Sequence, residues 1–95
     1  MGKLGIGVVG VGEMGKRHAE NLRRLVPEAR LIAVADAVAS RAKQVAEELE
    51  IEHSTGSLEE MVERKDIDAV LIATPDKFHA QGIRIAAAAD RKSVV

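Results

Sequence analysis

The sequence contains no cysteine, tryptophan or tyrosine, and Phe78 is its single aromatic residue. Without cysteine the chain can form neither disulfides nor thiolate metal sites. Neither sign of charge dominates, because 14 basic and 15 acidic residues give a formal net charge of −1. Attraction to nucleic acid or to an anionic membrane surface is therefore not indicated. No apolar run approaches the length of a membrane span.

The length and the start of the chain suggest a small cytoplasmic protein. A total of 95 residues predicts one domain, residues 1–95. A first strand is expected to begin at about Leu4, which leaves no room for a signal peptide. The three histidines have no ligand spacing and no carboxylate pattern joins them, so we expect no metal site.

A glycine-rich turn follows the first apolar run. The run Leu4–Val9 is typical of a buried strand, and Gly10-Val11-Gly12-Glu13-Met14-Gly15 is a complete G-x-G-x-x-G motif. Gly10 would permit the tight turn, Gly12 would let a pyrophosphate approach the backbone, and Gly15 would let the helix pack near the strand. The motif would hold the pyrophosphate at the helix N-terminus, where free N–H groups and the helix dipole favour an anion.

Asp36 ends the second apolar run, Leu31–Ala35, about 20 residues after Gly15 as in dinucleotide-binding units. A carboxylate at this place accepts the hydroxyl protons of an adenosine ribose and repels the 2′-phosphate of NADP. The cofactor expected is therefore NAD, although Arg41 is near enough to tolerate a phosphate. The alternative is that Asp36 is the N-cap of the next helix.

Helical and strand patterns alternate along the rest of the chain. Strands are expected at residues 4–9, 31–35, 53–55 and 69–73, with another beginning at 93–95, and helices at 14–26, 39–50, 57–64 and 77–89. The third helix begins with a capping-box pattern, Ser57 followed by Glu60. The alternation predicts an α/β fold, a Rossmann-type doubly wound parallel sheet that is incomplete at its C-terminal end.

The segment Ala73–His79 closes the fourth strand and opens a helix. Ligands of open α/β sheets bind outside the carboxyl ends of the strands, so this segment is expected to border the ligand crevice. A structural interpretation is compatible with that one: Pro75 fixes the turn and Asp76 caps the helix.

Three segments together, GVGEMGKRHAENL, LIAVAD and DAVLIATPDKFHA, resemble the Gfo/Idh/MocA family of oxidoreductases, which includes glucose–fructose oxidoreductase and inositol dehydrogenases. The resemblance covers Leu4 to about Ala89, and the A-T-P-x-x-x-H segment is its most specific part. It implies that Thr74 and Pro75 line the cofactor near its riboses and nicotinamide, and that His79 stands at the mouth of the same crevice. The alternative is that His79 is a partly exposed residue of the first helical turn.

The resemblance also shows what the 95 residues do not include. Family members are several times longer, and they carry a Glu-Lys-Pro segment with an active-site lysine and a second domain with the substrate pocket and a catalytic histidine. Neither has a counterpart here, so we assign no catalytic residue and expect a truncated N-terminal dinucleotide-binding domain. The glycine that the family commonly has at the end of the last helix is also missing from Asp90-Arg91-Lys92-Ser93.

The resemblance therefore predicts the NAD-binding part of an oxidoreductase that acts, as a full-length enzyme, on a sugar, cyclitol or related polyol. Two alternatives stay open: a non-catalytic NAD-binding module and an inactive truncated product. A methyltransferase is disfavoured, because Val8 and Val9 rather than an acid precede the glycine turn. Val94 and Val95 would leave an unpaired apolar strand edge, which favours self-association.

Overall fold

The structure is a computed structural model that describes residues 4–25, 28–74 and 79–94. Strands and helices alternate along these residues. The elements are β1 (Leu4–Val9), α1 (Glu13–Leu25), β2 (Ala29–Ala35), α2 (Ala39–Glu48), β3 (His53–Thr55), α3 (Leu58–Val62), β4 (Ala69–Ile72), α4 (His79–Ala88) and β5 (Lys92–Val94). Each element predicted from the sequence is present, although α2 and α3 end earlier than predicted.

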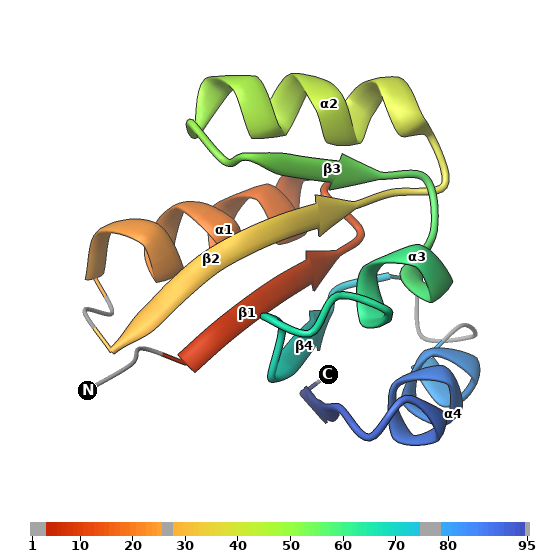
Figure 1. The fold of residues 1–95 in the computed structure, drawn as a ribbon. Helices are drawn as coiled ribbons and strands as arrows, with labels where there is room; N and C mark the ends of the chain where they lie inside the picture. The colour runs from red at the N-terminus through yellow and green to blue at the C-terminus, as the bar shows by residue number, and fades with distance from the viewer. Residues whose placement is uncertain (1–3, 26–27, 75–78, 95) are drawn as a thin grey trace.

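The five strands form one parallel sheet in the order β3-β2-β1-β4-β5 (Figure 1). The central strand β1 pairs with β2 on one side and with β4 on the other. The strand order therefore reverses between β1 and β4, and a reversal of this kind opens a crevice at the carboxyl ends of the two strands. The predicted Rossmann-type doubly wound sheet is confirmed.

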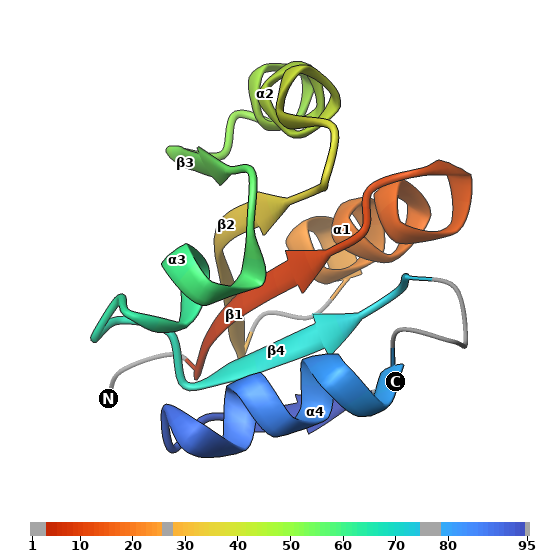
Figure 2. The same ribbon diagram turned by 90° about the vertical axis from the view of Figure 1, so that its right-hand side faces the viewer.

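Helices cover both faces of the sheet, with α1 and α2 on one face and α3 and α4 on the other (Figure 2). Strands buried on both faces are expected to be almost wholly apolar, as β1, β2 and β4 are. Two hydrophobic cores result. The core beneath α1 and α2 includes Val8, Val34, Ala42, Val45 and Leu49, and the core beneath α3 and α4 includes Val9, Met61, Val62, Ile72 and Ala86.

Two helices end in the same way, with an acidic residue in the left-handed region. After α2, Glu50 has φ of 57°, and after α4, Asp90 has φ of 59°. The next residue in each case donates its N–H back to the helix, from Ile51 to Ala46 O and from Arg91 to Ala86 O, both at 2.8 Å. These are Schellman motifs, in which glycine is the usual residue at the left-handed position. They explain why α2 ends two residues before the predicted Glu50.

The short helix α3 begins at the predicted cap. Ser57 Oγ accepts a hydrogen bond from Glu60 N–H at 3.2 Å, as expected for an N-cap serine. In a capping box the side chain of Glu60 would accept the N–H of Ser57. Here that N–H donates instead to Thr55 Oγ1, at 3.3 Å. None of the helices in the described segments combines the length and the hydropathy needed to cross a membrane.

Candidate functional site

Gly10 marks the point where three strands end close together. Its φ is +87°, and its N–H donates to Ala35 O at the end of β2 at 2.7 Å. A Cβ on Gly10 would lie 3.0 Å from the carbonyl carbon of Ala73 and from Thr74 N, just after β4. The turn therefore needs glycine both for its backbone conformation and for the close approach of β4.

The two other motif glycines have opposite surroundings. A Cβ on Gly15 would collide with the carbonyl oxygen of Gly10, so the start of α1 packs directly on the turn. A Cβ on Gly12 would meet no described atom within 4 Å. Gly12 O accepts the first bond of α1, from Lys16 N–H at 2.8 Å. Open space above Gly12 at the N-terminus of a helix is what a phosphate group requires. Glu13 and Met14 supply the first backbone groups of α1; their side chains are outside the description.

Asp36 follows β2 and is only 9% exposed. Its Oδ2 accepts from Val11 N–H in the glycine turn at 2.9 Å, and its Oδ1 accepts from Val38 N–H at 2.8 Å. The interpretation of Asp36 as the N-cap of α2 is wrong, because Val38 is the N-cap and no side chain caps this helix. The carboxylate instead ties the glycine turn to the start of α2.

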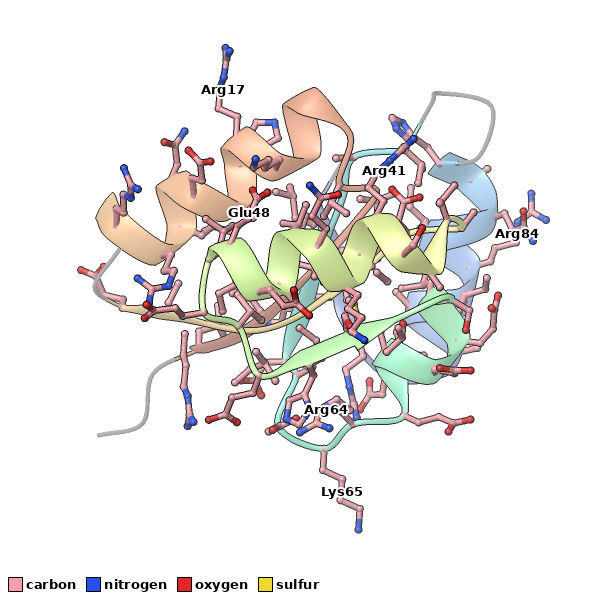
Figure 3. The ribbon with its side chains drawn as sticks, turned by 90° about the horizontal axis from the view of Figure 1, so that it is seen from above. Arg17, Arg41, Glu48, Arg64, Lys65 and Arg84 are labelled. Carbon is pink, nitrogen blue, oxygen red and sulfur yellow. The ribbon has the colours of Figure 1, made fainter. Side chains whose placement is uncertain are left out.

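Two basic side chains flank this region. Arg41 Nη1 lies 3.8 Å from Asp36 Oδ2, beyond hydrogen-bond distance. Lys16 Nζ of α1 lies 2.5 Å from Glu48 Oε2 of α2. Glu48 extends from α2 on the side that faces α1 (Figure 3). The hydrogen bond between the two side chains raises the pKa of Lys16 and lowers the pKa of Glu48. The positively charged ammonium group of Lys16 is therefore already paired with a carboxylate.

The segment after β4 is only partly described. Thr74 O and His79 Nε2 are 2.6 Å apart, and because a carbonyl can only accept, this ring nitrogen donates its hydrogen. Thr74 Oγ1 is buried, and it finds no hydrogen-bond partner among the described residues. His79 is the first residue of α4 and half-buried. Pro75 and Asp76 lie outside the described residues.

A groove of about 250 Å³ opens beside Asp36, at the carboxyl ends of the strands and between α3 and α4. Asp36 and Thr74 both line it, so the fold brings together two of the predicted site residues. The motif glycines and His79 are not part of its lining. The lining is Val9, Ala35, Asp36, Ala37, Gly56, Ser57, Leu58, Glu59, Ile72, Thr74, Gln81, Gly82 and Ile85.

Sequence reasoning missed the part of this groove formed by the start of α3 and by one face of α4. The helical spacing of Gly82 and Ile85 shows that they share a face, but it does not show that this face lies opposite Asp36. Among the residues that the structure describes, no group of three or more His, Asp or Glu side chains is placed to hold a metal ion.

Comparison with known proteins places these features in a family. Residues 4–95 match the model of the Gfo/Idh/MocA oxidoreductase family, NAD-binding Rossmann fold. The chain is 44% identical over 87 residues to scyllo-inositol 2-dehydrogenase (NAD(+)) of Bacillus subtilis (strain 168). The aligned residues cover 92% of this chain and 25% of that protein. It is 35% identical over 89 residues to myo-inositol 2-dehydrogenase of Thermotoga maritima, covering 94% of this chain and 26% of that protein.

Solved structures agree with these relatives. The crystal structure of scyllo-inositol dehydrogenase from Lactobacillus casei, with bound cofactor NAD(H) and scyllo-inositol, matches with a TM-score of 0.88 at 35% identity. The match covers 96% of this chain and 27% of that one, so the chain spans about a quarter of the length of such relatives. The chain belongs to the Gfo/Idh/MocA oxidoreductase family and carries its NAD-binding Rossmann domain.

Proposed function

We propose that residues 1–95 hold NAD(H) with the residues described above, as the dinucleotide-binding domain of an oxidoreductase that acts on a cyclitol, sugar or related polyol. The observation that carries the proposal is the arrangement of the Asp36 carboxylate beside the glycine turn. Val11 N–H and Val38 N–H each occupy one lone pair of a different carboxylate oxygen. Each oxygen keeps a second lone pair, so the carboxylate can accept both hydroxyl groups of a ribose while it stays fixed.

The other parts of the cofactor have places around this carboxylate. The open space above Gly12 at the N-terminus of α1 fits the pyrophosphate, because backbone N–H groups and the helix dipole favour an anion there. The groove beside Asp36 is lined by apolar side chains such as Val9, Leu58 and Ile72, which suits the flat adenine ring.

The segment after β4 begins with Thr74 at the border of this groove, and we expect it to continue along the riboses and the nicotinamide of the cofactor. Thr74 has a buried hydroxyl without a partner among the described residues, a group for which a ribose is a fitting partner. Pro75 is expected beside it. His79 holds the carbonyl of Thr74 and thereby steadies the border of the groove. Glu13 and Met14 would contribute through the backbone at the start of α1.

The chemistry of the proposed enzyme is a hydride transfer, which the nicotinamide supplies when it is bound. The residues of this chain bind and orient: Asp36 fixes the ribose, the glycine turn fixes the pyrophosphate, and the groove shields the adenine from water. The two curated relatives named above are inositol dehydrogenases, which supports a cyclitol as the substrate class. No described residue is proposed to take or give a proton.

Titration with NADH tests the proposal directly. The chain contains neither tryptophan nor tyrosine, so the fluorescence of the cofactor can be followed almost without protein background. We expect saturable binding that Asp36→Ala weakens by at least tenfold, because the ribose loses two hydrogen bonds to a charged group. Asp68→Ala is the matched control, since Asp68 also accepts a backbone N–H, from Gly5 at 2.8 Å, at the opposite end of β1.

Two results would contradict the proposal. A chain that is folded by circular dichroism and does not bind NADH would show that these residues form no cofactor site by themselves. Equal losses in Asp36→Ala and Asp68→Ala would show that the carboxylate of Asp36 supports the fold and does not contact the ribose.

A further inference from the structure

The exposed surface of α4 is apolar for a helix on the outside of the molecule. Its exposed residues include Ala80, Ile83, Ala87 and Ala88, and Ile83 is 39% exposed. Arg84 is the single Lys, Arg, Asp or Glu residue of this helix. On α2, by contrast, most of the exposed residues are charged. Because the outer face of a surface helix is usually polar, the surface of α4 indicates a contact with another molecule.

Ile83 and Ala87 lie on the flank of α4 that faces away from α3. The flank that faces α3 is known from the groove, because Gln81 and Ile85 line it together with the start of α3. Residues two positions apart are about 200° apart around a helix axis, so Ile83 and Ala87 point the other way. Since α4 packs over β4 and β5 and α3 packs over β2 and β3, this flank borders the open side of β5 (Figure 2).

The strand β5 offers hydrogen-bonding groups directly beside this flank. No strand lies beyond β5 in the described part of the chain. Lys92 N–H donates inward, to Asp68 O at 3.2 Å, so the N–H and C=O of Ser93 face outward. Ser93 can therefore exchange two hydrogen bonds with Ser93 of an antiparallel second copy, and a two-fold axis then passes between the two serines.

This pairing brings two α4 helices to packing distance. Strands of a sheet are about 4.8 Å apart, so a helix over β4 and β5 lies about one strand spacing from the two-fold axis. The axes of the two α4 helices are then roughly 10 Å apart, on the same face of the joined sheet. Packed helices have axes about 8–10 Å apart, and small residues such as Ala87 permit the close approach.

The level at which the two helices meet follows from two contacts within one copy. Gly82 lies against β4, because a Cβ on it would be 3.0 Å from Ile72 Cδ1. Ser93 pairs with Val70, two residues before Ile72. Two residues of strand span about 6.6 Å, which corresponds to about four residues of helix. The two-fold axis through Ser93 therefore meets α4 close to Ala87.

The charges near this axis are complementary. In an antiparallel pair of helices centred near Ala87, residues equally far before and after it come level with each other. Arg84 and Asp90 are each three residues from Ala87, so Arg84 of one copy comes level with Asp90 of the other, twice in the dimer. Arg84 extends outward from α4 (Figure 3). Within the described residues, neither side chain has an ion-pair partner in its own copy.

We propose that this chain forms a two-fold symmetric dimer through β5 and the flank of α4 that carries Ile83 and Ala87. The two β5 strands pair antiparallel and join the two sheets, and the two α4 flanks pack on each other beside them. The groove beside Asp36 borders the opposite flank of α4, so the dimer leaves it open.

Sedimentation velocity over a range of concentrations tests the proposal on the 95-residue chain. Ile83→Lys and Ala87→Lys should each raise the dissociation constant of the dimer at least about tenfold, because they place two ammonium groups close to the axis in an apolar contact. Ala88→Lys is the matched control, since Ala88 is also an exposed alanine of α4 but points away from this flank. It should leave the dissociation constant within about twofold. Circular dichroism checks the fold of each variant.

Charge reversal tests the geometry of the pair. Arg84→Asp and Asp90→Arg should each raise the dissociation constant several-fold, because each places like charges level with each other. The double variant restores opposite charges and should return the dissociation constant to within about twofold of the parent value. A loss in the double variant as large as the sum of the two single losses would contradict the proposed register.

Three further results would refute the dimer. The first is a parent chain that stays monomeric at every concentration. The second is an association that Ile83→Lys, Ala87→Lys and Ala88→Lys weaken equally or leave unchanged, because the α4 flank then takes no part in it. The third is a series of species larger than a dimer, since two-fold pairing of β5 uses up the open edge and closes the assembly.

Discussion

At the glycine turn, two residues of one motif differ in what a side chain would meet. Alanine at position 15 would place its Cβ against the carbonyl oxygen of Gly10, which is backbone and cannot rotate away. We expect Gly15→Ala to destabilise the fold by about 2 kcal/mol or more and to abolish NADH binding. Gly12→Ala meets open space, so it should cost about 1 kcal/mol or less but still raise the Kd for NADH at least tenfold.

Thermal unfolding and NADH titration of the two variants measure both effects. The contrast is informative because both changes add the same methyl group within one motif. A Gly12→Ala chain that binds NADH like the parent would place the pyrophosphate away from Gly12. A Gly15→Ala chain with unchanged stability would show that α1 can move away from the turn at little cost.

Single residues also show how far the sequence could predict the site. The spacing of Gly10, Gly12 and Gly15 after an apolar run is a local signal, and it predicted the turn and the start of α1 correctly. The sequence also showed that Asp36 directly follows the apolar run of β2. It did not show that Asp36 bonds to Val11 N–H, because that contact joins residues 25 positions apart and depends on the twist and register of β1 and β2.

At the scale of elements, the ends of α2 and α4 carry avoidable strain. Glu50 and Asp90 occupy the left-handed region, which costs a residue with a Cβ up to about 1–2 kcal/mol, less for Asp, and costs glycine little. We expect Glu50→Gly and Asp90→Gly each to raise the free energy of unfolding by about 0.5–1 kcal/mol. The bond that Glu50 loses, to Arg23, is exposed and contributes little.

Lys43→Gly provides the control, because Lys43 is exposed within α2 and in a helical conformation. This change should lower the free energy of unfolding by about 1 kcal/mol. Chemical denaturation measures all three variants. If Glu50→Gly and Asp90→Gly were as destabilising as Lys43→Gly, the inference of left-handed strain at positions 50 and 90 would be wrong.

Elements far apart in sequence form the groove, and for this reason the sequence predicted it less well than it predicted the strands. The strands β1, β2 and β4 were found because each is a short apolar run that is buried on both faces. Which faces of α3 and α4 border Asp36 depends on how the two helices cross the sheet. That crossing follows from packing around Met61 and Ile72 in the core beneath α3 and α4, and no short sequence pattern corresponds to this packing.

At the scale of the whole molecule, β5 is the edge strand beside β4, and an open strand edge favours association of copies. Lys92 N–H donates to Asp68 O at 3.2 Å, inward to β4. Because N–H groups alternate in direction along a strand, Ser93 N–H faces the open edge. We expect the 95-residue chain to self-associate in sedimentation velocity experiments as its concentration rises, and Ser93→Pro to reduce this association with little loss of stability.

Lys92→Pro is the matched variant for this edge. It removes the N–H that holds β5 to β4, so it should lower the melting temperature by several degrees, as expected for a loss of about 1 kcal/mol in a domain of this size. The comparison of Ser93→Pro with Lys92→Pro therefore distinguishes the effect of the outward-facing N–H of β5 from the effect of the N–H that faces β4. If the parent chain stays monomeric at every concentration, or if Ser93→Pro associates as strongly as the parent, β5 does not form the interface between copies. The Lys16–Glu48 and Arg23–Glu50 ion pairs join α1 to the end of α2 and to the residue that follows it, away from this edge. An association that weakened only with salt would therefore also argue against β5.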